Sequence, residues 1–286
     1  MKSEGYFVPH HAYWPIVGSI ALFMAFIGAS NWLNGNIDGS FLLFGGLILL
    51  LVMIFGWFSK VVAESEAAMY NSQVDRSFRW GMAWFIISEI FFFAGFFGAL
   101  FYIRQFSLPW ISGEGHGFYT FTELWNSFVY TWPSNGPAGL GGDFKAMPPW
   151  GIPAINTALL LTSGVTITLA HHALKENHRK ALVLWMMATI LLGVLFVGLQ
   201  GYEYYHAWSE LNLTLSSGAY GSTFYLLTGF HGFHVTIGAI MLIVVTFRCA
   251  LGHFKPESHF AFEAVAWYWH FVDVVWLGLF VFVYWL

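Results

Sequence analysis

The sequence has few charged residues. Only 9% of its 286 residues are Asp, Glu, Lys or Arg, whereas soluble domains contain about 25%. A soluble fold cannot cover its surface with so few polar groups, and a disordered chain would have fewer aromatic residues than the 21% found here. The net charge of -4 and the lack of a basic patch argue against a nucleic-acid-binding protein. With 58% hydrophobic residues, the sequence indicates an integral membrane protein.

Cysteine is nearly absent as well. Cys249 is the only one, which excludes an intrachain disulfide, a Cys-x-x-Cys-His haem attachment, an iron–sulfur cluster and a two-thiolate copper centre. Residues 1–15 also lack the short apolar core and small-residue cleavage site of a signal peptide. We therefore expect the first apolar stretch to remain as a membrane span.

Long stretches without Asp, Glu, Lys or Arg dominate the chain. A helix needs about 20 residues to cross a hydrocarbon core of about 30 Å. Allowing for Glu89 in the third stretch and Asp273 in the last, seven such stretches occur: 13–33, 39–59, 80–103, 150–174, 181–202, 217–247 and 264–286. Because a helix satisfies its own backbone hydrogen bonds in a bilayer, we predict an all-α, polytopic membrane protein with seven transmembrane helices.

The Lys and Arg residues predict the orientation of these spans. With seven spans, only Arg104 and Lys145 fall on the side opposite the N-terminus. The other nine share one side: Lys2, Lys60, Arg76, Arg79, Lys175, Arg179, Lys180, Arg248 and Lys255. Since cytoplasmic loops carry the excess of positive charge, we expect the N-terminus inside and the C-terminus outside.

Two connections stand out within what we expect to be a single transmembrane domain over residues 1–286. The 104–149 connection is rich in Gly, Pro and Trp and is predicted to be a long, ordered outer loop. The acidic and basic residues of the 60–79 connection predict helical extensions into water. No inverted repeat with matching broken helices, typical of secondary transporters, is visible.

Glu89 lies near the middle of the third predicted span. An ionised carboxylate there costs roughly several kcal/mol unless it is paired or hydrated. Two interpretations therefore remain open. In one, a protonated Glu89 donates a hydrogen bond to a neighbouring helix. In the other, which we favour, it is a functional carboxyl that exchanges a proton or faces lipid. The surrounding phenylalanines favour the protonated form.

Further polar residues lie in the last two spans. Glu263, His270 and Asp273 are spaced seven and three apart, on one helix face, and His231 and His234 are three apart. Such side chains are suitable metal ligands, but no His-Glu-x-x-His pattern occurs and we expect no metal or haem site. We predict instead that these five residues form an intramembrane polar network. Five glycines are predicted to allow close helix approach there: Gly95, Gly98, Gly229, Gly232 and Gly238.

Two polar groups lie at span ends. Adjacent residues point about 100° apart on a helix, so His171 and His172 cannot both face one small ligand. They are predicted to be interfacial polar caps. Arg248, His253 and Lys255 form a basic cluster on the predicted inner side. Such clusters attract anionic lipid headgroups.

Four segments resemble the cytochrome c oxidase subunit III family of haem–copper oxidases. They read WGMAWFIISEIFFFAGFF at 80–97, INTALLLTSGVTITLAHHALKENHR at 155–179, YGSTFYLLTGFHGFHVTIGA at 220–239 and HFAFEAVAWYWHFVDVVWL at 259–277. The resemblance extends over nearly the whole chain. Quinol-oxidase relatives usually have five spans, so seven spans favour the cytochrome c branch.

The resemblance implies a non-catalytic core subunit of a proton-pumping aa3-type oxidase in a bacterial inner membrane. Residues 1–70 would form two helices, separated from a five-helix bundle of residues 71–286 by a phospholipid-holding cleft. The partners would be subunit I, with haem a, haem a3 and copper, and subunit II, with a two-copper centre; cytochrome c would be the substrate of the complex. This chain would bind phospholipids and no redox cofactor. It would protect subunit I from turnover-linked inactivation and support proton uptake.

The resemblance also implies roles for individual residues. Glu89 matches the family's buried carboxyl in the third helix. Five residues match its lipid-contact positions: Trp57, Glu64, Arg248, His253 and Phe254. The chain departs from the family at 69–72, where it reads Met-Tyr-Asn-Ser and relatives often have Gly-His-His-Thr.

Other classes of membrane protein remain as alternatives. A catalytic haem–copper subunit would need more spans and a His-Pro-containing copper loop, and no His-Pro occurs. A secondary transporter would have unwound helices around Glu89. A stand-alone cytochrome b-type anchor would hold haem on its own histidines.

Overall fold

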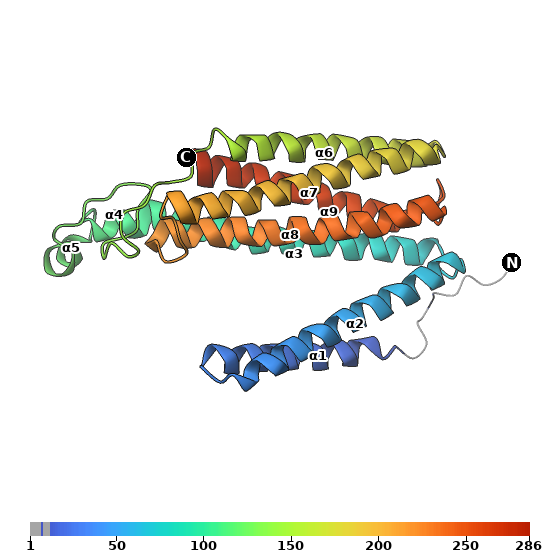
Figure 1. The fold of residues 1–286 in the computed structure, drawn as a ribbon, viewed down its shortest axis with the longest axis horizontal. Coiled ribbons are helices and arrows are strands. Elements are labelled where there is room, and N and C mark those ends of the chain that lie inside the picture. The colour runs from blue at the N-terminus through green and yellow to red at the C-terminus, as the bar shows by residue number, and fades with distance from the viewer. Residues whose placement is uncertain (1–6, 8–11) are drawn as a thin grey trace. The chain divides into compact units, whose positions relative to one another are not determined.

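The computed structural model describes residue 7 and residues 12–286; Lys2, which counts in the topology prediction, lies outside them. The helices are α1 (Trp14–Leu33), α2 (Asp38–Glu66), α3 (Ser72–Tyr102), the π-helical η1 (Ile103–Ser107), α4 (Leu108–Ile111), α5 (Phe118–Leu124), α6 (Ile152–Lys175), α7 (Arg179–Glu210), α8 (Gly218–Leu251), α9 (Phe260–Leu279) and the π-helical η2 (Phe280–Trp285) (Figure 1). The described residues contain no β-strand.

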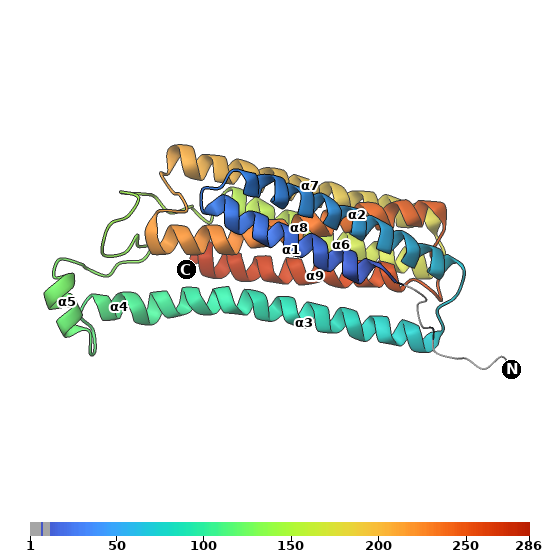
Figure 2. The same cartoon turned by 90° about the horizontal axis from the view of Figure 1, so that it is seen from below.

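Seven helical segments of the described chain are long and apolar enough to span a membrane, which confirms the predicted fold class. The third extends over 40 residues, because α3 continues through η1 into α4 (Figure 2). The helices extend past several predicted ends. For example, α2 continues to Glu66 and α7 to Glu210, because acidic side chains end an apolar stretch without ending a helix.

The first compact unit of the chain ends at Trp80, and in it α1 packs along α2 through small residues. The buried residues of α1 are all Gly or Ala: Gly18, Ala21, Ala25 and Gly28. A Cβ on Gly28 would overlap the backbone N of Leu43, and one on Gly46 would lie 2.5 Å from the backbone N of Ala25. The two backbones are therefore in contact, which is how helices associate in lipid without a hydrophobic driving force.

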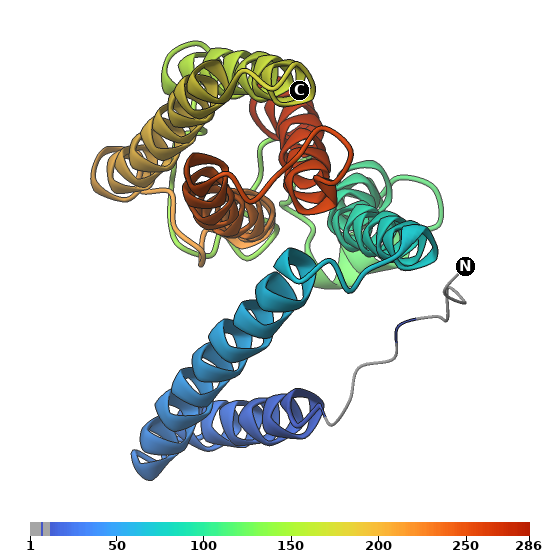
Figure 3. The ribbon, with the colours of Figure 1, turned by 90° about the vertical axis from the view of Figure 1, so that its right-hand side faces the viewer.

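The second compact unit comprises residues 81–286, and α9 is its central helix. Viewed along the helices, α9 has α6, α8 and α3 around it (Figure 3). Two fully buried tryptophans of α9 fix its rotation. The indole N–H of Trp269 donates to Ser163 Oγ at 2.8 Å, and that of Trp276 donates to Thr157 Oγ1 at 2.9 Å. Both partners lie on α6, so these bonds fix how α9 packs against α6.

The glycines predicted to allow close approach give a mixed result. A Cβ on Gly238 would lie 2.9 Å from the ring of Trp269, as predicted, and one on Gly229 would make an ordinary contact with Tyr204. The prediction was wrong for Gly95, Gly98 and Gly232, where an added Cβ would meet nothing within 4 Å in this chain. These glycines lie on open helix faces.

The 104–149 connection begins as helix and then becomes irregular. Its later part is attached by hydrogen bonds to the segment between α7 and α8. Lys145 N donates to the Leu211 carbonyl at 2.9 Å, and Asn212 Nδ2 donates to the Asp143 carbonyl at 2.8 Å. These bonds explain why a segment so rich in glycine is ordered.

Candidate functional sites within the bundle

Glu89 of α3 contacts His234 of α8 inside the membrane-spanning part of the bundle. Glu89 Oε2 lies 2.7 Å from His234 Nε2, and His234 Nδ1 lies 2.6 Å from the carbonyl oxygen of Phe230. Because a carbonyl only accepts hydrogen bonds, Nδ1 carries a hydrogen. The contact with Glu89 then requires one further proton, held either by the carboxyl or by Nε2. The pair therefore shares one exchangeable proton.

Aromatic rings surround this pair. The ring of Phe93 lies 5.0 Å from the His234 ring and that of Phe92 lies 5.9 Å from it. The Tyr268 hydroxyl donates to the His234 backbone carbonyl at 3.3 Å. The side chains of His234 and Glu89 are only 10% and 21% exposed, so both side chains are held in an apolar environment.

His231 does not join this pair, although it is one turn from His234. It is 1% exposed, and neither ring nitrogen has a hydrogen-bond partner among the described residues. Its ring packs against Trp276 at 5.3 Å and Phe196 at 5.8 Å. His231 therefore faces α7 and α9, whereas His234 faces α3.

The three polar residues of α9 divide into two groups. Asp273 is buried and lies 3.8 Å from His270 Nδ1, and a Cβ on Gly164 of α6 would lie 2.6 Å from its Oδ2. Glu263 lies at the beginning of α9, where its Oε1 is 3.3 Å from His259 Nε2 and 3.6 Å from His171 Nε2. The residues predicted as one network thus occur in separate places.

A buried carboxyl that the sequence analysis missed lies near the end of α7. Glu203 is fully buried, and its Oε1 accepts hydrogen bonds from the Tyr284 hydroxyl at 2.5 Å and from Gln200 Nε2 at 3.3 Å. The predicted span ended at residue 202 because Glu203 is acidic. The available signal was the aromatic sequence Tyr-Glu-Tyr-Tyr at 202–205, which is typical of a helix still within the bundle.

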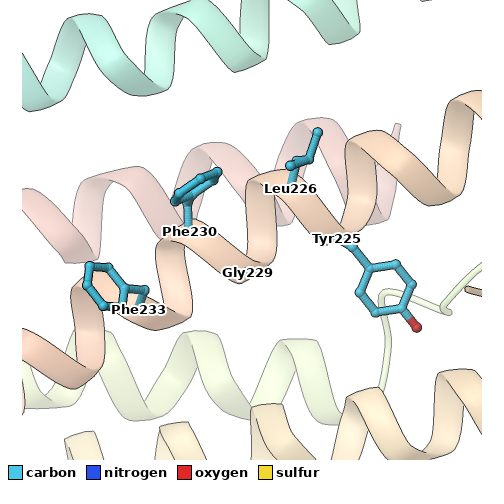
Figure 4. A pocket seen from close by; sticks show the side chains of 5 residues that line it. All are labelled: Tyr225, Leu226, Gly229, Phe230 and Phe233. Carbon is cyan, nitrogen blue, oxygen red and sulfur yellow. The ribbon is translucent and has the colours of Figure 1, made fainter. Parts of the chain in front are cut away.

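An open apolar groove of about 350 Å³ lies on α8, lined by Tyr225, Leu226, Gly229, Phe230 and Phe233. Figure 4 shows Gly229 between the four larger side chains. The absence of a side chain at Gly229 leaves the helix surface hollowed at that position.

A family profile described as cytochrome c oxidase subunit III matches residues 4–109 and 124–286. The chain belongs to this family. Cytochrome c oxidase subunit 3 of Latimeria chalumnae is 40% identical over 285 residues, which cover 99% of this chain and 98% of the relative. The Arabidopsis thaliana protein of that name is 41% identical over 273 residues, which cover 95% and 92%.

The family match and the seven helices establish a multi-pass membrane protein of the subunit III family. The profile passes over residues 110–123. This segment contains the end of α4 and most of α5. The family profile therefore leaves part of the 104–149 connection unmatched.

Of the five lipid-contact residues expected for subunit III, Trp57 lies within α2 and the other four lie near or just beyond the ends of α2 and α8. In the first unit, Trp57 is an exposed residue of α2 and Glu64 accepts a hydrogen bond from the Tyr70 hydroxyl at 2.8 Å. Burial and the neighbouring Glu64 carboxylate raise the pKa of Tyr70 above its ordinary value. Tyr70 thus lies in the connection between α2 and α3 and remains a neutral donor.

In the second unit, the Arg248 guanidinium lies 4.6 Å from the centre of the Phe254 ring. The backbone N of His253 donates to the Arg248 carbonyl at 3.1 Å. Gly252, between them, has a φ of +81°, and a Cβ there would overlap the Arg179 guanidinium. Two guanidinium groups therefore lie at this turn, where they favour an anionic ligand.

Replacing Glu89 by glutamine tests the role of the proton-sharing pair. We expect oxidase turnover to stay within about a factor of two, a barrier change of about 0.4 kcal/mol, because a carboxyl that shares a proton with His234 does not itself transfer electrons. The carboxyl signal of Glu89 should disappear from the infrared spectrum of the complex. Glu210→Gln, at an exposed glutamate of α7, is the control. Near-complete loss of oxidase activity in Glu89→Gln alone would contradict this expectation.

Replacing Arg248 by glutamine tests the lipid contact. We expect less tightly bound anionic phospholipid in the purified complex, measured by mass spectrometry of extracted lipids, because one of the two guanidinium groups at the turn is lost. The matched control is Arg104→Gln, since Arg104 also lies over an aromatic ring, that of Trp132 at 5.4 Å. Equal lipid content in the two variants would refute the assignment.

Proposed function

We propose that this chain acts as the non-catalytic subunit III of a proton-pumping, aa3-type cytochrome c oxidase in a bacterial inner membrane. In this role it binds structural phospholipids, protects the catalytic subunit from inactivation during turnover and supports proton uptake. Its N-terminus lies inside and its C-terminus outside. The partners are subunit I, which holds haem a, haem a3 and copper, and subunit II, which receives electrons from cytochrome c.

The observation that carries the proposal is the exposed apolar surface of the first three helices. Only 22% of the most apolar part of α1, and 11% of that of α2 and α3, is buried within the chain, against 50% for α9. Apolar side chains on these helices therefore need lipid or another membrane subunit around them. The open groove on α8 (Figure 4) adds a further apolar surface of this kind.

The proposed support of proton uptake depends on the Glu89–His234 pair. It holds one exchangeable proton within a membrane span, and intramembrane ionisable groups are generally functional. In a subunit without a redox centre, such a group can hold or release a proton without taking part in electron transfer.

Two rival functions are disfavoured by the arrangement of the helices. A transporter would have unwound helices around its central acidic residue, whereas α3 is unbroken from Ser72 to Tyr102 through Glu89. A haem-binding anchor would need histidines free to bind iron, whereas the His231 ring is enclosed by Phe196 and Trp276. Both ring nitrogens of His234 already contact the Phe230 carbonyl and Glu89.

Removing the chain from the purified complex tests the proposal. We expect a modest fall in initial oxidase rate but a several-fold fall in the number of turnovers before inactivation, because the catalytic subunit loses its neighbouring subunit and lipids. Adding back the chain with phospholipid should restore the number of turnovers. Mock-treated complex is the control, and an unchanged number of turnovers after removal would overturn the protective role. Haem absorbance that stays with the separated chain would favour the anchor instead.

A further inference from the structure

Three potential metal ligands meet where α6 ends and α9 begins. His171 is on the last turn but one of α6, His259 directly precedes α9, and Glu263 is in the first turn of α9. His171 Nε2 and His259 Nε2 are 3.2 Å apart. Glu263 Oε1 lies 3.3 Å from His259 Nε2 and 3.6 Å from His171 Nε2. We propose that these three residues bind a zinc ion.

The three distances match a tetrahedral zinc site. Zinc binds imidazole nitrogen and carboxylate oxygen at about 2.0–2.2 Å, so two ligand atoms of a tetrahedron lie about 3.3–3.6 Å apart. The edges of the triangle, 3.2, 3.3 and 3.6 Å, agree with this spacing. A zinc ion just outside the plane of the triangle reaches all three atoms. The fourth position is then available for water.

The hydrogen bonding of His259 prepares its ring for metal binding. Its Nδ1 lies 3.1 Å from the Lys255 carbonyl, and because a carbonyl only accepts, Nδ1 carries the hydrogen. In the neutral imidazole Nε2 is then unprotonated and directs its lone pair at the other two ligand atoms. Metal-binding histidines commonly have this backbone hydrogen bond, which fixes the tautomer and the ring orientation.

Local geometry also places Glu263 and His171. His259 and Glu263 are four residues apart, so the first turn of α9 brings them to one side. The His171 ring packs against Phe262 at 5.5 Å, which orients it from the opposite helix. The exposed fractions of the three side chains are 27% for His171, 9% for His259 and 15% for Glu263. The site is thus largely shielded but still open to an ion from one side.

The ligand types select the metal. Two imidazoles and one carboxylate suit zinc and related transition metals, whereas magnesium and calcium require mainly oxygen ligands. The sequence predicts no metal site, because its spacing places Glu263 with His270 and Asp273 and because His171 was predicted to be a polar cap. A bound zinc ion would connect the end of α6 to the start of α9. This is the end of the bundle opposite the 104–149 connection.

Zinc titration of the intact, chelator-treated oxidase complex tests the site. We expect one zinc-binding event, measured by calorimetry, that weakens at least tenfold in both His171→Gln and Glu263→Gln. His178→Gln is the matched control, because His178 lies just beyond the end of α6 and is not one of the three ligands. Among the described residues, its ion-pair partner is Glu176. Excess magnesium should not displace the zinc. Equal zinc affinity in the wild type, both ligand variants and the control would overturn the proposal.

X-ray absorption by one equivalent of zinc on the wild-type complex gives a second test that needs no variant. We expect two imidazole nitrogens and two oxygens at about 2.0–2.2 Å. A ligand set with fewer than two imidazoles would overturn the assignment, even if the ligand variants failed to assemble. Neither measurement depends on oxidase activity, so failure of the zinc site and failure of the proposed function are distinguishable.

Discussion

Replacing Trp269 by alanine should lower the free energy of unfolding of the bundle by about 3–5 kcal/mol, the usual loss for a large buried aromatic residue. Trp269 is fully buried, and an added Cβ at Gly193 or Gly238 would lie within 3 Å of its ring. Glycine has no side chain that could move into the space left by the indole, so we expect a loss near the upper end of this range. Release of the subunit during thermal denaturation of the complex measures the effect.

Trp267→Ala is the matched control for this prediction. Trp267 is two residues away on α9 and 36% exposed, so its replacement should change the free energy of unfolding by less than about 1 kcal/mol. Ser163 makes a second hydrogen bond, to the Leu160 carbonyl, and therefore keeps a partner when the indole is removed. Similar losses in the two tryptophan variants would show that Trp269 is not the packing centre of the bundle.

Replacing Gly28 by alanine should separate α1 from α2 and destabilise their packing by about 1–3 kcal/mol, as overpacking does. The new Cβ would overlap the backbone of α2 at Leu43, which cannot move as a flexible side chain can. Helix propensity alone would favour alanine by about 1 kcal/mol, so a loss of stability has to come from the helix contact. Spin labels at Phe23→Cys and Phe55→Cys, two exposed positions, report the distance between the helices.

Gly45→Ala on α2 is the control for the Gly28 variant. Its Cβ would meet only the end of the Met24 side chain, at 3.6 Å, which is an ordinary contact. We expect an unchanged label distance and equal or higher stability, opposite in sign to the effect at Gly28. A broadened distance distribution in both variants, or in neither, would contradict the small-residue contact.

The sequence predicts the number and type of the helices because a bilayer leaves the backbone few alternatives. A segment without water must form its own hydrogen bonds, so hydropathy and length were sufficient to find all seven spans. Helix ends were predicted less well. The span before Glu203 was ended at the acidic residue, whereas in the structure that carboxyl is buried with Tyr284, 81 residues further along the chain.

Single polar residues were found, but their partners were not. Glu89 and His234 were each singled out, yet they are 145 residues apart in sequence and nothing in either segment indicates that they meet. Spacing placed Glu263, His270 and Asp273 on one face of α9 and implied one network. The packing of α6 divides them, because Gly164 admits Asp273 and His171 approaches Glu263.

By itself, the sequence determined the membrane class, the seven helices and the family. It also showed that polar side chains lie within the spans, where their burial in the bilayer is energetically unfavourable. Only the tertiary structure decided which of those groups share a proton, which are enclosed by aromatic rings and which meet as a set of metal ligands. Helix periodicity determines the face on which a side chain lies. The neighbour across that face depends on how close and at what rotation two helices pack, and this is decided by small residues and buried tryptophans distributed along the whole chain.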